Sequence, residues 1–147
     1  MNANRVAIIG INLISASIAL GLQEYEESVE VVGYDTDRAI ADLAKVRGVF
    51  DAVPRKPGPA CEGAALVIVA EPLADIEKTF AAISPHLEEG AVVTDTARLK
   101  APVLRWAENL LPERAAFVGG HLIPNPAVIG LRSLEGLEDA SAELLEI

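Results

Sequence analysis

An apolar run that stops at a glycine, followed by a helical pattern and a second apolar run, limits this chain to very few folds. The first run is Val6–Ile9, Gly10 ends it, and the second run closes with Val31-Val32-Gly33-Tyr34-Asp35. Between the two runs, apolar side chains recur at helical spacing over 13–25. This order predicts a βαβ unit with two parallel strands and a right-handed crossover helix.

The residues at the turn and at the tip of the second strand also point to a ligand. In βαβ units that bind dinucleotides, glycines let the backbone approach a pyrophosphate, and the helix N-terminus faces its charge. A carboxylate at the end of the second strand holds the ribose hydroxyls, and Asp35 stands at that position. The pattern G-x-G-x-x-G is incomplete, because Asn12 and Ser15 replace its second and third glycines. The layout therefore predicts the fold and leaves cofactor binding open.

The alternation of strand and helix patterns continues along the chain. Strands are expected at 6–9, 29–34, 65–70, 91–94 and 116–118, with a short one at 51–53. Helices are expected at 13–25, 38–46, 73–83 and 101–111, and the Pro/Gly-rich stretch 54–63 is expected to be irregular. The repeated βαβ pattern predicts an α/β fold with a doubly wound parallel sheet of the Rossmann type. We expect this domain to span 1–121, with 122–147 as a C-terminal extension that packs on it or on a second subunit.

Composition excludes several classes of partner and compartment. The net charge of −10 argues against nucleic acid or an anionic membrane as a partner. No apolar run approaches the roughly 20 residues of a membrane helix, and the N-terminus shows no signal-peptide pattern. A lone cysteine, Cys61, excludes an internal disulfide framework and suits a reducing cytoplasm, where we expect the protein to work. The sequence predicts no metal site.

Four stretches, in order, resemble the prephenate and arogenate dehydrogenase family of tyrosine biosynthesis. They are VAIIGINLISAS (6–17), VVGYDTD (31–37), GAVVTDTARLKAP (90–102) and FVGGH (117–121). The combination of T-D-x-x-x-x-K-x-P with F-V-G-G-H is much more specific than the Rossmann elements, which many dehydrogenases share. Family members oxidise a cyclohexadienol with loss of CO₂ and pass a hydride to NAD or NADP. The resemblance thus implies an NAD-dependent oxidoreductase acting on prephenate or arogenate.

The resemblance also implies roles for individual residues. His121 matches a histidine that serves as a base or hydrogen-bond acceptor for the substrate's ring hydroxyl, and an imidazole with a pKa of about 6.5 suits that role. Asp35 matches the ribose-binding carboxylate and favours NAD, because a 2′-phosphate would meet its charge. The cofactor contacts implied for pyrophosphate, ribose and nicotinamide are Gly10, Ile11, Asn12, Leu13, Ile14, Asp35, Ala70, Glu71, Pro72, Asp95 and Thr96.

Several positions depart from the family pattern at the expected site. Asn12 places a side chain where the backbone should meet the pyrophosphate, so NAD binding is expected to be weak or lost. Glu71 adds a negative charge where a small or apolar residue is usual. Ala97-Arg98 replaces a Gly-Ser pair whose serine helps to bind substrate, and Arg98 becomes a candidate contact for a substrate anion. Leu122 replaces the usual proline after the histidine.

The family's helical second domain, which dimerises and contacts the substrate, has no counterpart in these 147 residues. We expect either the first part of a longer protein or a protein that lacks that domain. Leucines at 131, 134, 137, 144 and 145 predict that 131–147 forms a homodimer interface, or else folds back on its own sheet. Two other functions remain open: a diverged Rossmann domain that acts as a regulatory or interaction module, and a binder of a different small anion through Arg98.

Overall fold

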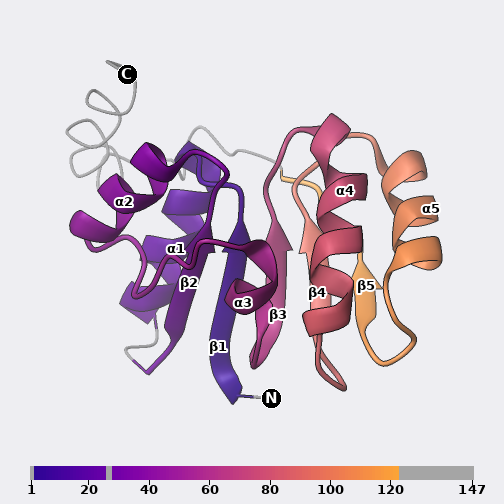
Figure 1. The fold of residues 1–147 in the computed structure, drawn as a ribbon, viewed down its shortest axis with the longest axis horizontal. Coiled ribbons are helices and arrows are strands. Elements are labelled where there is room, and N and C mark those ends of the chain that lie inside the picture. Colours follow the sequence, from indigo (N-terminus) through magenta and orange to yellow (C-terminus); the bar gives the residue numbers. More distant parts are fainter. Residues whose placement is uncertain (1, 26–27, 123–147) are drawn as a thin grey trace.

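The computed structural model describes residues 2–25 and 28–122, which form a five-stranded parallel sheet with helices on both faces (Figure 1). The strands are β1 (Asn2–Ile9), β2 (Glu30–Tyr34), β3 (Ala64–Val69), β4 (Val92–Asp95) and β5 (Ala116–Val118). The helices are α1 (Leu13–Tyr25), α2 (Arg38–Val46), α3 (Pro57–Cys61), α4 (Leu73–Ile83) and α5 (Lys100–Leu110), with a 3₁₀ helix η1 (Ser84–His86).

The strand order β2-β1-β3-β4-β5 places a topological switch at β1. The chain moves outward from β1 to β2, then returns past β1 to add β3, β4 and β5 on the other side, and all neighbouring strands are parallel. In such sheets the crevice outside the carboxyl ends of the strands, at the switch, is where ligands bind. This arrangement confirms the predicted doubly wound sheet.

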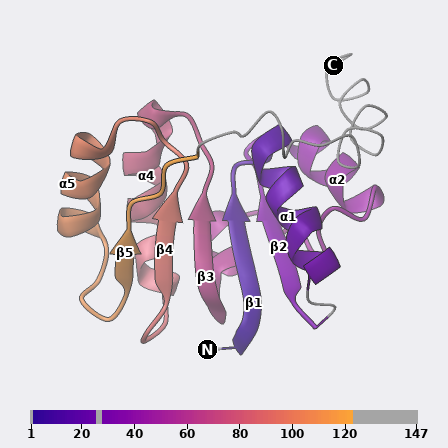
Figure 2. The ribbon, with the colours of Figure 1, turned by 180° about the vertical axis from the view of Figure 1, so that it is seen from behind.

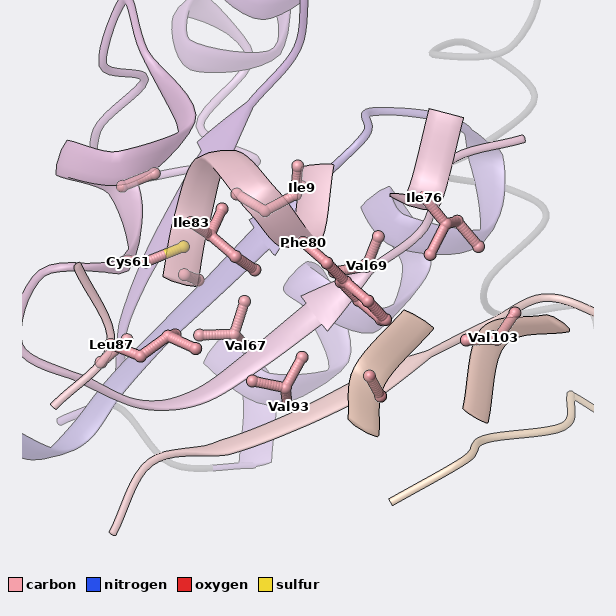
Figure 3. Packing of buried hydrophobic residues seen from close by; sticks show 14 of the residues in the cluster. Ile9, Cys61, Val67, Val69, Ile76, Phe80, Ile83, Leu87, Val93 and Val103 are labelled. Atoms are coloured by element: carbon pink, nitrogen blue, oxygen red, sulfur yellow. The ribbon is translucent and has the colours of Figure 1, made fainter. Parts of the chain in front are cut away.

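Both faces of the central strands are buried, which explains their continuous apolar sequences. Ile8 of β1 packs in the cluster shared with α1 and α2, whereas its neighbour Ile9 packs in the cluster shared with α3, α4 and α5. In the second cluster Phe80 of α4 is fully buried, and its ring meets that of Phe117 edge to face at 5.6 Å between centroids. Figure 3 shows Phe80 with Val69 of β3 in this cluster.

The stretch between β2 and β3 differs from the prediction. At 51–53 the expected strand is a single parallel bridge between Ala52 and Val32. The stretch 54–63, expected to be irregular, contains the helix α3, which begins with Pro57. Proline is tolerated there because the first turn of a helix leaves its N–H groups without intrahelical acceptors. Five residues are too few to show helical periodicity, and burial of Cys61 in the core holds the helix in place; that burial raises the pKa of its thiol to about 12.

One side of the sheet is less covered than the other. Helices α1 and α2 cover one face of the sheet at β1 and β2. On that same face, the described residues place no helix over β4 and β5 (Figure 2). Val92 and Thr94 are half-buried there, while Ala116 and Val118 are exposed, the latter to 58%. Most of the expected C-terminal extension, including the leucines at 131–145, lies outside the described residues. Within the described ranges, no helix has the length and apolarity to cross a lipid bilayer.

Candidate functional site

A pocket of about 440 Å³ opens at the carboxyl ends of β1, β2 and β3, at the topological switch. Its volume falls within the range of about 300–1,000 Å³ that is typical of small-molecule sites. Seven predicted site residues line it: Gly10, Ile11, Asn12, Asp35, Ala70, Glu71 and Pro72. Parallel strands end at one edge of the sheet, so residues as far apart in sequence as Gly10 and Pro72 lie together in one pocket, as the strand-end reasoning predicted.

Gly10, directly after β1, packs against the backbone of Ala70, directly after β3. Its φ of +93° is a conformation that other residues rarely adopt, and a Cβ built on it would lie 2.7 Å from the carbonyl oxygen of Ala70. Its N–H donates to the carbonyl oxygen of Tyr34 at 2.8 Å. Both the backbone conformation and the lack of space require glycine here.

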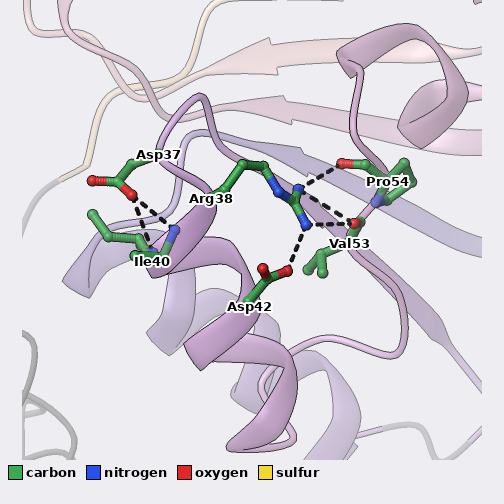
Figure 4. Close-up of polar contacts among 7 residues, drawn as sticks. Asp37, Arg38, Ile40, Asp42, Val53 and Pro54 are labelled. Atoms are coloured by element: carbon green, nitrogen blue, oxygen red, sulfur yellow. Dashed lines mark hydrogen bonds and ion pairs between the residues drawn. The ribbon is translucent and has the colours of Figure 1, made fainter.

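Asp35 is held in place by two backbone donors. The N–H of Ile11 donates to Oδ2 at 2.7 Å, and the N–H of Asp37 donates to Oδ1 at 2.7 Å. Each carboxylate oxygen can accept more than one hydrogen bond, so Asp35 retains acceptor capacity toward ribose hydroxyls. The nearby guanidinium of Arg38 is engaged elsewhere: it pairs with Asp42 at 2.5 Å and donates to the carbonyl oxygen of Pro54 at 3.1 Å (Figure 4).

Asn12 caps helix α1 with its own side chain. Its Oδ1 accepts from the N–H groups of Ile14 (3.0 Å) and Ser15 (3.1 Å), and its Nδ2 donates to the carbonyl oxygen of Ala70 at 2.7 Å. The hydroxyl of Ser15 in turn accepts from the N–H of Asn12 at 2.8 Å. Backbone N–H groups in the first helical turn are the donors that bind an anion at a helix N-terminus. In this structure the amide oxygen of Asn12 already occupies two of them.

Glu71 makes the floor of the pocket acidic. It is half-buried, and the buried hydroxyl of Thr79 donates to its carboxylate. Burial raises the pKa of Glu71, against the lowering effect of the Thr79 hydrogen bond, and the neighbouring Asp75 and Asp35 carboxylates raise it further. Burial, followed by the charges of Glu71 and Asp35, likewise raises the pKa of Tyr34. Such a lining suits a neutral nucleoside better than a free anion.

A second group of predicted residues lies at the ends of β4 and β5. Asp95 is only 2% exposed; it forms an ion pair with Lys100 and accepts from the N–H groups of Ala97 (2.9 Å) and Gly120 (3.1 Å). The N–H of Thr96 donates to the carbonyl oxygen of Val69 at 3.1 Å, which joins this group to β3.

The remaining predicted residues are exposed. His121 follows Gly120 directly and is exposed to solvent, and Arg98 is exposed in the loop between β4 and α5. Leu13 and Ile14 are exposed on the first turn of α1, next to the Asn12 cap. These four positions border the strand ends without lining the pocket.

Sequence reasoning missed the wall of the pocket that α4 supplies. The residues it omitted are Tyr34, Thr36, Pro57, Asp75, Lys78, Thr79 and Ala82. Four of them, at 75, 78, 79 and 82, share one face of α4, because residues three or four apart lie on the same side of a helix. That spacing directly after the β3 strand end is the signal that could have found them. The described part of the chain contains no group of three or more potential metal ligands.

Comparison with known proteins identifies the family to which this chain belongs. The model of the prephenate dehydrogenase nucleotide-binding domain matches residues 18–146. The prephenate dehydrogenase of Lactococcus lactis subsp. cremoris is 30% identical over 119 residues, which is 80% of this chain and 33% of that protein.

Solved structures of similar proteins support the same family. Prephenate dehydrogenase from A. aeolicus, in complex with hydroxyphenyl propionate and NAD+, matches 84% of this chain and 43% of its own with a TM-score of 0.73 and 25% identity. Synechocystis arogenate dehydrogenase matches 80% of this chain and 40% of its own with a TM-score of 0.71 and 26% identity. The chain thus spans less than half the length of these relatives, and the family match begins after the Gly10–Ser15 turn. By its fold and its sequence, the chain belongs to the prephenate dehydrogenase nucleotide-binding domain family.

Proposed function

We propose that this chain binds NAD at the carboxyl edge of its sheet and forms the nucleotide-binding part of a prephenate- or arogenate-oxidising enzyme. The observation that carries the proposal is the 440 Å³ pocket in which Gly10 and Asp35 meet at the topological switch. A nucleoside fits its volume and acidic lining, and Asp35 has free acceptor capacity for the ribose. In this proposal a pyrophosphate reaches the N–H groups at the start of α1 once the Asn12 amide has rotated away from them.

In this proposal the chain's own residues bind and orient the reactants, and NAD supplies a hydride acceptor when it is bound. His121, exposed beside the β4 and β5 ends, accepts a hydrogen bond or a proton from the substrate's ring hydroxyl. The exposed guanidinium of Arg98 meets a carboxylate of that substrate. The names of the relatives support this reaction, which belongs to tyrosine biosynthesis. The free thiol Cys61 suits a cytoplasmic enzyme.

The test is a calorimetric titration with NAD and with NADP. We expect NAD to bind at least about tenfold more tightly than NADP, because a 2′-phosphate would meet the Asp35 carboxylate. This ratio corresponds to a difference in binding free energy of about 1.4 kcal/mol or more. Arg38 cannot neutralise that phosphate without giving up Asp42 and two backbone carbonyls. The variant Asp35→Ser should reduce the difference in affinity between NAD and NADP. Absence of binding at millimolar NAD would remove the proposed function, and a preference for NADP would remove the role of Asp35.

The charge of Glu71 is expected to make NAD binding depend on pH. Because the pKa of Glu71 is raised, the parent should bind NAD more tightly as pH falls and this carboxylate takes up a proton, whereas Glu71→Gln should bind more tightly at neutral pH and show less pH dependence. The stability of the fold is expected to change with pH in the same direction. Because the pKa of Glu71 is higher in the folded than in the unfolded state, this group stabilises the fold at pH values below its unfolded-state pKa, and the contribution is lost as pH rises through its folded-state pKa.

Glu71→Gln should therefore unfold at a higher denaturant concentration than the parent at pH 7, with the difference shrinking as pH falls toward 4. Glu77, an exposed residue of the nearby helix α4, does not line the pocket, so Glu77→Gln is the matched control and should change neither property. Equal pH profiles for NAD binding in the parent and in Glu71→Gln would show that this carboxylate does not face the cofactor.

A non-catalytic role is the second candidate, and one observation favours it. The Asn12 side chain satisfies the α1 N–H groups that a pyrophosphate would need, as would be expected of a diverged domain that no longer binds a cofactor. Such a domain would serve as a regulatory or interaction module. The NAD titration separates the two candidates, since the module would give no heat with either dinucleotide.

We also propose that the chain forms a homodimer. The support comes from the face of β4 and β5 that no helix of residues 2–25 and 28–122 covers, where Val118 is exposed, since apolar faces of this kind usually lie at interfaces. Light scattering should show a dimer, and Val118→Asp should shift the parent mass toward the 15.5 kDa monomer. Val46→Asp, at an 83% exposed position on α2, is the control and should leave the dimer intact. A parent protein that is monomeric at micromolar concentration would contradict the proposal.

A further inference from the structure

A buried carboxylate ties the Gly119-Gly120-His121 segment to the neighbouring strand. The side chain of Asp95, at the end of β4, has no exposed surface. Its Oδ1 accepts from the N–H of Gly120 at 3.1 Å, and its Oδ2 accepts from the ammonium of Lys100 and from the N–H of Ala97 at 2.9 Å. One carboxylate thus joins the end of β4, the start of α5 and the segment that leads to His121.

The two glycines before His121 lie close to the end of β4 and to the Lys100 side chain. A Cβ built on Gly120 would lie 2.2 Å from the backbone oxygen of Asp95 and 3.0 Å from the hydroxyl of Thr94. A Cβ on Gly119 would lie 3.3 Å from Cδ of Lys100. Any side chain at 120 would therefore push the segment away from β4 and break the bond to Asp95. Because β5 has only three residues, this contact is a major constraint on where the chain goes after Val118.

Lys100 makes the buried carboxylate tolerable. It is the first residue of α5, its side chain is 26% exposed, and its ammonium is the one cation in contact with Asp95 among the described residues. Without this cation, Asp95 would remain a buried charge held only by two backbone donors, and an unpaired buried carboxylate is costly and tends to draw in water. That water would compete with the Gly120 N–H for the carboxylate.

We propose that Asp95 and Lys100 are a positioning pair that sets the place of His121. The inference rests on the proposed function, in which His121 contacts the substrate, and it gives a physical reason for finding T-D-x-x-x-x-K and G-G-H in one sequence. In this proposal Asp95, which the sequence predicted to be a cofactor contact, acts through Gly120. Lys100 acts through Asp95.

The test compares Lys100→Met with Lys100→Arg by NMR of the isotopically labelled full chain. Lys100→Met should raise the hydrogen-exchange rate of the Gly120 amide by about tenfold or more and shift the ring signals of His121, because water drawn to the unpaired Asp95 carboxylate competes with the Gly120 N–H and the segment opens more readily. Lys100→Arg keeps the cation and should keep Gly120 close to the parent rate. Asp95→Asn should resemble Lys100→Met. Asp42→Asn, which breaks the exposed pair with Arg38 on α2, is the control and should leave both signals unchanged.

Amides of β1 report whether each variant is folded, so the effect at Gly120 is separable from a general loss of stability. If Asp95→Asn does not fold, the two Lys100 variants still decide. Unchanged Gly120 exchange and unchanged His121 ring signals in a folded Lys100→Met protein would overturn the positioning pair. NAD titration of the parent is independent of these signals. If the parent did not bind NAD, the proposed function would be removed, but the Gly120 result would still show that Lys100 and Asp95 hold the segment before His121 in place.

Discussion

Asn12→Gly is expected to tighten NAD binding by about ten- to hundredfold, which corresponds to about 1.4–2.7 kcal/mol. In the parent, a pyrophosphate can reach the N–H groups of Ile14 and Ser15 only after the Asn12 amide gives up both of them and its bond to Ala70. Each neutral hydrogen bond contributes about 0.5–1.5 kcal/mol net. Glycine removes this competition, and calorimetric titration of the two proteins measures the gain.

The structure gives Asn12→Gly a cost as well as a benefit. A glycine cap is weaker than an asparagine cap by a few tenths of a kcal/mol, so the variant should be slightly less stable. Asn12→Asp is the matched control: it keeps an oxygen for the cap, loses the donor to Ala70 and adds a negative charge, so it should bind NAD more weakly than the parent. An Asn12→Gly protein that is folded and binds NAD no better than the parent would refute the competition argument.

Phe80→Ala is expected to cause the largest loss of stability, about 3–5 kcal/mol in the free energy of unfolding. Phe80 of α4 is fully buried in a cluster with residues of the sheet and of α5, and truncation would leave a cavity that the surrounding β-branched side chains cannot fill. Urea-induced unfolding of the parent and the variant measures the difference. A domain of this size has about 5–15 kcal/mol of stability in total, so the variant should be close to unfolding.

Phe117→Ala tests whether burial, and not simply loss of an aromatic ring, sets this cost. The two rings share the same edge-to-face contact, but Phe117 lies on the edge strand β5 and is only half-buried. Its truncation should therefore cost clearly less than that of Phe80. Equal losses in the two variants would mean that the contact between the rings, not the buried volume, dominates.

Much of the fold could be predicted because its signals are local. The bounds expected for α1, α2 and α4 agree with the structure, since apolar periodicity and helix-ending residues lie within each segment. At α2 the signals are visible in atomic detail: Asp37 caps the first turn by accepting from the N–H of Ala39, and Gly48 follows the helix with a φ of +73°. The helix α3 escaped prediction because a buried five-residue segment has no period to detect.

The position of the candidate site was also predictable, because it depends on topology more than on side-chain detail. Parallel strands end at the same edge, so Gly10, Asp35 and Glu71 had to lie near one another once the βαβ pattern was recognised. What these side chains bond to was not predictable in the same way. Asn12 was expected to crowd a pyrophosphate with its Cβ, whereas in the structure its amide caps α1 and reaches Ala70, 58 residues away.

Asp95 illustrates the same division between local and long-range information. Its place at a strand end follows from the apolar run before it, but its hydrogen bond to Gly120 joins residues 25 positions apart and depends on how β4, β5 and α5 pack. Periodicity, turns and strand ends are properties of neighbouring residues, so the amino-acid order alone was enough for the α/β architecture and the location of the crevice. Which donors and acceptors in that crevice are already satisfied depends on partners from distant strands, and this became visible only once the chain was folded, because hydrogen bonds require angstrom-level placement that sequence spacing does not contain.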